Sequence, residues 1–342
     1  MKRKLTVIIS FCSMVFLILD TRTVLYGASE GIILCLKTVI PALFPFIFLS
    51  VPLTAALLGS RLPQLFGKLL RMPQGCESLW LVGILGGYPI GAQCIAQAAE
   101  KGRISPSDAR RMLCFCSNAG PSFIFGIGMG LLGEFRLCLL VWLIQLLSSI
   151  AVCILTPGKP DQPQALPSSA LPSLSASLRR AITTMAMVCG WVLLFRIVIE
   201  VLAKWILWPL PVMPKILCFG MLELANGCRA LMELESAALR FILFCTLLSF
   251  GGLCVAMQTF AVTANSGVDA TWYLPAKMCQ AACSFIISSL AAHFLFPGEL
   301  IVRPSWVFLS IILSLSYGLA LRKNGLEIQK KIVYNKCTLH TR

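Results

Sequence analysis

Two stretches of the chain combine apolar residues with glycine, proline and asparagine in a pattern that could do chemistry inside a membrane. The first reads Gly87-Tyr88-Pro89-Ile90-Gly91, and a short charged loop separates it from the second, Asn118-Ala119-Gly120-Pro121. Glycine and proline break helices and free backbone groups that hydrocarbon cannot satisfy, so such breaks line protein or a water-filled cavity. Helix ends at the breaks would present N–H groups at the positive end of the dipole, which favours an anionic ligand.

The residues at these breaks add hydrogen-bond donors without a fixed charge, as a carrier needs if its solute must also leave. We predict a solute site built from Gly87, Tyr88, Pro89, Gly91, Gln93, Asn118, Gly120, Pro121 and Ser122. The alternative is that the glycines only permit close packing of helices, as small residues do in membrane bundles. The clustering of several such residues in two adjacent breaks favours the site.

A weaker copy of the pattern follows in the second half of the chain. It has one break at residues 223–227 and another at residues 249–252, and it adds Asn226, Gly227, Ser249, Gly251 and Gly252 to the predicted substrate-binding set.

Glu223 is the candidate for proton or sodium coupling, because an ionisable residue inside a membrane segment is costly to bury and is functional by default. The alternative places Glu223 nearer the surface or pairs it with Arg229. Arg196 and Glu200, four residues apart, are predicted to form a structural pair. Lys277 is predicted to snorkel to the cytoplasmic side.

The elements that must position these residues are membrane helices. The 342 residues are 58% hydrophobic and 13% charged, whereas a soluble domain is about 25% charged. The net charge of +15 does not indicate nucleic-acid binding, because the cations lie at the ends of apolar runs and in loops. Two histidines and no paired CxxC modules predict neither a metal site nor a cofactor.

Hydropathy predicts an all-α, polytopic membrane helix bundle with about eight full spans and two re-entrant or broken-helix segments. The spans are residues 5–19, 40–59, 112–132, 137–155, 181–202, 241–258, 271–296 and 306–321, and the re-entrant segments are 78–99 and 216–229. A hairpin with its tip at residues 86–91 keeps the basic loops on both sides of it inside the cell. Both termini are then cytoplasmic, and the first helix is retained because no small-residue cleavage site follows it.

The charged loop between the first two breaks ends in a helix start. Ser105 is the predicted cap, Pro106 is the first helical residue and Asp108 lies in the first turn.

The chain divides into five regions. They are an N-terminal membrane helix with an interfacial segment (1–35), a first repeat (36–157), a Pro/Ser-rich linker (158–178), a second repeat (179–297), and a last membrane helix with a basic cytoplasmic tail (298–342). The first repeat would enter its hairpin from the cytoplasm and the second from outside. This is an inverted repeat, which many secondary transporters use to form a site near the membrane midplane.

The first pair of breaks and the charged loop between them resemble the nucleoside-recognition "Gate" domain, and more closely the sporulation integral membrane proteins of the YlbJ type. The matching residues are Gly87, Tyr88, Pro89, Gly91, Asn118, Gly120 and Pro121. The resemblance implies Gate-like repeats, a distant relation to concentrative nucleoside carriers, and a role in spore maturation. It also implies passage of dipicolinate, a small dicarboxylate, across a forespore membrane.

Enzymatic motifs are missing from the sequence: we find no HExxH, GxSxG or GxxxxGK[ST] pattern, and we expect a protein that is not an enzyme. The leading hypothesis is a multi-pass transporter or channel-like carrier of a small anionic solute in the cell or forespore membrane. Its expected partners are the lipid bilayer, the solute and other sporulation membrane proteins. The alternatives are a membrane scaffold that does not transport, and a nucleoside carrier.

Overall fold

The computed structural model describes residues 2–57, 76–156 and 171–299, and the ordered elements in these ranges are helical. The predicted basic loop 61–75, most of the linker 158–178, and the last predicted helix and tail lie outside the described residues.

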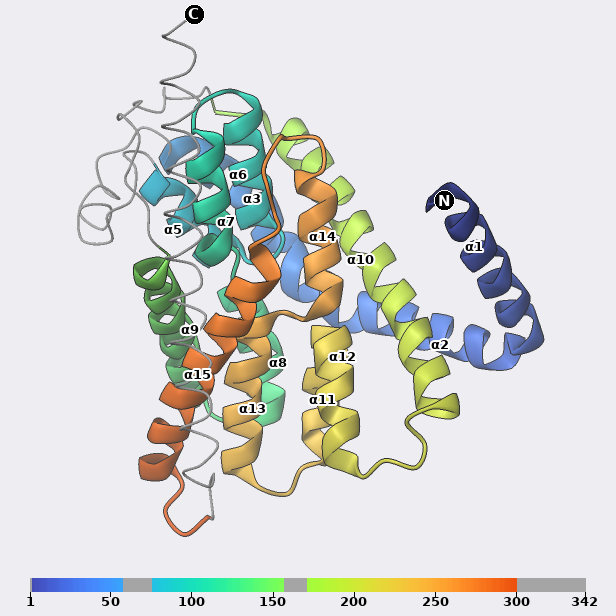
Figure 1. Cartoon of the computed structure of the whole chain (residues 1–342). Coiled ribbons are helices and arrows are strands. Elements are labelled where there is room, and N and C mark those ends of the chain that lie inside the picture. The colour runs from blue at the N-terminus through green and yellow to red at the C-terminus, as the bar shows by residue number, and fades with distance from the viewer. Residues whose placement is uncertain (1, 58–75, 157–170, 300–342) are drawn as a thin grey trace, which may run out of the picture.

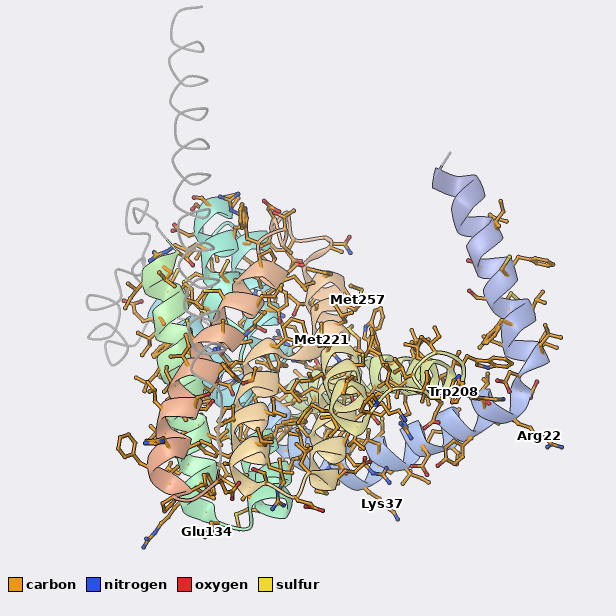
Figure 2. All side chains as sticks on the ribbon, turned by 60° about the horizontal axis from the view of Figure 1, so that its bottom comes forward. Arg22, Lys37, Glu134, Trp208, Met221 and Met257 are labelled. Atoms are coloured by element: carbon orange, nitrogen blue, oxygen red, sulfur yellow. The ribbon has the colours of Figure 1, made fainter. Side chains whose placement is uncertain are left out.

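The chain begins with two helices joined at Asp20, α1 (Lys2–Leu19) and α2 (Thr21–Leu34), and α2 continues through a π-helical turn (Cys35–Val39) into α3 (Ile40–Leu57). The segment predicted to be interfacial is therefore the first part of one long apolar run. Figures 1 and 2 show α1 projecting away from the other helices, and Figure 2 shows Arg22 pointing outward near the corner between α1 and α2.

The first half contains a hairpin, a broken helix and a full span: α5 (Cys76–Gly86), α6 (Ile90–Glu100), α7 (Pro106–Cys116), α8 (Pro121–Leu132) and α9 (Phe135–Leu155). The predicted start of α7 is confirmed. The Ser105 side chain accepts from the Asp108 backbone N–H at 3.1 Å, and Pro106 is the first helical residue. The cap supplies a partner for a backbone donor that has none within the helix.

The second half has the same order of elements after the long α10 (Leu174–Trp205). A hairpin of α11 (Val212–Leu222) and α12 (Leu224–Ala230) leads through a short 3-10 turn (Leu231–Glu233) to α13 (Ala237–Phe250), α14 (Gly252–Thr263) and α15 (Tyr273–Leu295). In each half the helices are therefore interrupted at the positions that the sequence predicts.

Six helical runs in the described ranges are long and apolar enough to cross a membrane: Thr21–Leu57, Pro106–Leu132, Phe135–Leu155, Leu174–Trp205, Ala237–Thr263 and Tyr273–Leu295. They coincide with six of the eight predicted spans. The first predicted span gives a shorter apolar helix, Ser10–Leu19, and the eighth lies outside the described residues. Over the described residues the chain is helical, and the length and apolar composition of these helices indicate an integral, multi-pass membrane protein.

The two hairpins lie toward opposite ends of the bundle in Figure 1. The α5–α6 hairpin and α7 lie in its upper part, whereas the α11–α12 hairpin and α13 lie in its lower part. α8 then continues downward from α7, and α14 upward from α13. α15 packs against α9 and α13, and α10 packs against α2 and α3.

Candidate functional site

The tip of the first hairpin touches the break between α7 and α8. Gly87 has a φ of +78°, and a Cβ atom added to it would lie 2.7 Å from the Gly120 nitrogen. Only glycine combines this backbone conformation with so close an approach. The Tyr88–Pro89 peptide bond at the tip is cis, and Pro89 precedes the first residue of α6.

The same tip reaches the break in the second half. Gly251 and Gly252 both have a φ of +83°, and they stand where α13 ends and α14 begins. The Tyr88 hydroxyl donates to the Leu248 carbonyl at 3.2 Å, and a Cβ atom on Gly251 would lie 3.0 Å from the Tyr88 oxygen. Tyr88 therefore joins the two halves at the point where both helices are broken.

Glu223 lies in the second hairpin, between α11 and α12, and is only 3% exposed. Its carboxylate accepts from the backbone N–H of Ala225 at 3.0 Å, and from the backbone and side-chain nitrogens of Asn226, both at 2.7 Å. Glu223 is thus the N-terminal cap of α12. The N–H groups that we expected a ligand to use at this break are occupied by the protein's own carboxylate.

A cavity lies between the two sets of breaks. It offers about 40 Å³ to the centres of water-sized molecules, within about 440 Å³ of non-atom space that includes open surroundings. Residues 119 and 120, between α7 and α8, and residues 223–225, at the turn between α11 and α12, line it. The rest of the lining is Tyr88, Gln258 and apolar side chains that include Val39, Phe123, Val192 and Val255. Its polar side chains are few, as in most small-molecule sites.

Of the predicted site residues, Tyr88, Gly120 and Glu223 line this cavity, whereas the others surround it or lie further off. A Cβ atom at Gly91 would meet the Cys116 carbonyl, one at Gly227 would meet the Gly220 backbone, and one at Gly252 would meet carbonyls at the end of α11. These three glycines therefore permit close packing of helices, as the alternative interpretation of the sequence holds.

The remaining predicted residues have structural partners or positions at helix ends. Gln93 donates to the Thr184 hydroxyl at 3.3 Å, Asn226 donates to Glu223, and Pro121 is the first residue of α8. Ser122 is buried in the first turn of α8. Asn118 and Ser249 belong to a buried polar network that also includes Ser148 and Gln280.

Lys277 does not snorkel, so that prediction is wrong. It is 1% exposed, and its ammonium donates to the Ser117 carbonyl and, at 2.7 Å, to Gln280 Oε1. The nitrogen also lies 5.1 Å from the centre of the Tyr88 ring. The physical reason is that α15 turns a polar face toward the bundle, where the unwound end of α7 offers a carbonyl as acceptor.

A signal for this buried lysine is present in the sequence. Tyr273, Lys277, Gln280, Ser284 and Ser288 recur at helical spacing in an otherwise apolar segment, and all five are buried in α15. A polar stripe of this period marks the face of a membrane helix that is turned to the protein interior.

The network continues from Gln280 to the break between α7 and α8 and to the break between α13 and α14. Gln280 Nε2 donates to Asn118 Oδ1 at 2.8 Å and to the Ser148 hydroxyl at 3.4 Å, and Ser148 lies 3.5 Å from the Ser249 hydroxyl. Asn118 in turn donates to the Phe115 carbonyl at 2.8 Å. Polar groups of α7, α9, α13 and α15 are thereby held together.

The charged residues weighed as pairs in the sequence, Arg196, Glu200 and Arg229, all form ion pairs. Arg196 and Glu200 pair along α10, as the four-residue spacing predicts. Arg229 pairs with Glu30 of α2 at 3.1 Å rather than with Glu223. Among the described residues, no group of His, Cys, Asp and Glu has the size to hold a metal ion.

No family model, curated protein or solved structure matches the chain.

Proposed function

We propose that the protein is a carrier that moves a small solute through the cavity between its two broken-helix regions. The observation that carries the proposal is that Tyr88, Gly120 and Glu223, which come from two hairpins and a broken helix, line one cavity inside an apolar bundle. Discontinuous helices that meet at a shared cavity are the usual construction of a transporter site.

The order and direction of the elements support an inverted repeat. Each half has a hairpin, a broken helix and a full span, and Figure 1 draws the two hairpins at opposite ends of the bundle. In this proposal the two hairpins enter the membrane from opposite sides, and alternating access results from movement of one half against the other.

A small anion is the proposed solute. The start of α8 at Gly120 faces the cavity with the positive end of a 12-residue helix, while the start of α12 is neutralised by Glu223. An anion in the cavity would be repelled by ionised Glu223, and protonation of this carboxyl removes the repulsion. Glu223 would therefore couple uptake of the anion to uptake of a proton.

The family resemblance of the first breaks makes dipicolinate the first solute to test and uridine the second. The full chain would be reconstituted in liposomes, and uptake measured with and without an inward proton gradient. We expect proton-driven uptake of dipicolinate that Gly87→Leu abolishes, because a side chain at this position clashes with Gly120.

Variants at Glu223 test the coupling. We expect Glu223→Gln to remove the dependence of uptake on the proton gradient, whereas Glu233→Gln, at an exposed position nearby, keeps it. Gradient dependence that persists in Glu223→Gln would contradict the role of Glu223. Absence of uptake of both solutes, with no change in Gly87→Leu or Asn118→Ala, would favour the scaffold.

A further inference from the structure

The carboxyl end of α7 directs three consecutive carbonyl groups into the protein interior. The Phe115 carbonyl accepts from Asn118 Nδ2 and from the Ser149 hydroxyl, both at 2.8 Å. The Cys116 carbonyl lies against the backbone of Gly83 and Gly91, where a Cβ atom would come within 1.9 and 2.3 Å of its oxygen. The third carbonyl, of Ser117, accepts from the Lys277 ammonium.

The Lys277 ammonium has three N–H donors. Two have oxygen partners, the Ser117 carbonyl and Gln280 Oε1, and the Tyr88 ring lies 5.1 Å from the nitrogen as a cation–π partner. None of the ion pairs found among the described residues includes Lys277. A charged group without a counter-ion at this depth is costly, which makes the residue a candidate for function.

The ionisable groups that face this amine come from α7 and from the tip of the first hairpin. They are the thiols of Cys114 and Cys116 on α7 and the phenol of Tyr88 at the hairpin tip. What favours a positive charge here is the end of α7 itself, where the helix dipole is negative and its last carbonyls have no partner within the helix.

We propose that the Lys277 ammonium is a built-in cation, which fills a site for a small monovalent cation at the broken end of α7. Unwound backbone carbonyls and half-helix carboxyl ends are the groups that hold Na⁺ at broken helices. In this chain an amine from α15 takes the place of the ion. Removal of the side chain leaves the Ser117 carbonyl, the Gln280 amide oxygen and space for water, which are ligands for Na⁺ or for a small ammonium ion.

The inference predicts a cation requirement that the native chain lacks. The purified full-length protein would be heated in detergent with sodium, lithium, methylammonium or choline chloride at one ionic strength. We expect the native Tm to be the same in all four salts. Lys277→Ala should melt lower in choline and regain about 5 °C or more in sodium or methylammonium, because a ligand that binds only the folded state raises Tm.

Matched variants separate a cation site from lost packing. Lys277→Met refills the volume with an uncharged side chain, so its Tm should be the same in all four salts. Lys215→Ala removes a lysine whose hydrogen bond to the Trp208 carbonyl is exposed. Its Tm should be the same in all four salts, as expected for the native chain.

Lys277→Ser is the second test variant where Lys277→Ala does not fold, because it leaves the same space for a cation and adds a hydroxyl as a polar group beside it. A Tm that is the same in all four salts, in whichever of these two variants folds, would overturn the proposal. So would failure of both to fold in every salt while Lys277→Met folds as the native chain does. Because the readout is stability, this result is independent of whether the protein transports dipicolinate.

Discussion

Glu223 accepts three hydrogen bonds within the first turn of α12, and it also faces the cavity. One carboxyl group therefore caps a half-helix and also contributes charge to the cavity. Protonation would weaken the cap, because a neutral carboxyl is a poorer acceptor than a carboxylate. In the proposed mechanism the same protonation lets an anion bind in the cavity. This dual role gives a local structural change that the proposed proton coupling could use.

At the residue scale, Asp20 also predicts a pH-dependent contact. Hydrogen bonds from Lys204 and from the Trp205 indole, at 2.8 and 2.7 Å, lower the pKa of Asp20 from 3.8 to about 2. Because the pKa is lower in the folded protein, the stabilisation is complete above about pH 4 and is lost as the pH falls toward 2.

The Trp205 indole N–H signal in an NMR spectrum measures this contact. We expect the signal to stay constant from neutral pH down to about pH 3 and to shift with a midpoint near pH 2, because about 2 is the pKa of Asp20 in the folded protein. Asp20→Asn should shift it at every pH. A native signal that already moves near pH 6 would contradict the assignment to Asp20.

At the element scale, glycine decides how closely the hairpins approach the broken helices. α5 and α6 hold the Cys116 carbonyl between Gly83 and Gly91, and α11 and α12 cross where Gly227 meets Gly220. Membrane helices gain little from burying apolar surface against each other, so backbone contacts of this kind supply much of their packing energy.

Alanine substitutions distinguish glycines that lie against neighbouring backbone from glycines with open space around them. A Cβ atom at Gly83 would meet the Cys116 oxygen at 1.9 Å and one at Gly227 would meet Gly220 Cα at 2.2 Å, whereas Gly190 in α10 has nothing within 4 Å. We expect Gly83→Ala and Gly227→Ala to lower the free energy of unfolding in detergent by about 1–3 kcal/mol.

Gly190→Ala is the control, and it should leave stability unchanged or raise it by about 0.5–1 kcal/mol, since alanine favours the helix. Equal effects at all three positions would show that the short backbone contacts do not carry stability.

At the scale of the whole molecule, the two halves repeat one order of elements, and breaks from both halves meet at Tyr88. Polar contacts join them beside the apolar packing: Tyr88 to the Leu248 carbonyl, Lys277 to the Ser117 carbonyl, and Gln280 to Asn118. Hydrogen bonds are directional, so a movement of one half relative to the other would break these contacts.

The opposite directions of the hairpins predict that the two connecting turns lie on opposite sides of the membrane. An epitope inserted after Gly102, in the exposed turn between α6 and α7, should be accessible from the cytoplasm. One inserted after Glu235, in the turn between α12 and α13, should be accessible from outside. Antibody access to both from the same side would rule out the inverted repeat.

Sequence by itself determined the class of the protein and the places where its helices break. Apolar length and low charge require membrane helices, and the Ser105 cap and the glycine and proline breaks act locally, so no tertiary contact was needed to predict them. The tertiary structure decided what those residues contact. The Glu223 carboxylate caps α12, and Lys277 meets the broken end of α7 rather than the surface. These outcomes depend on helices far apart in the chain, whose relative rotation and depth are set by packing and not by local composition.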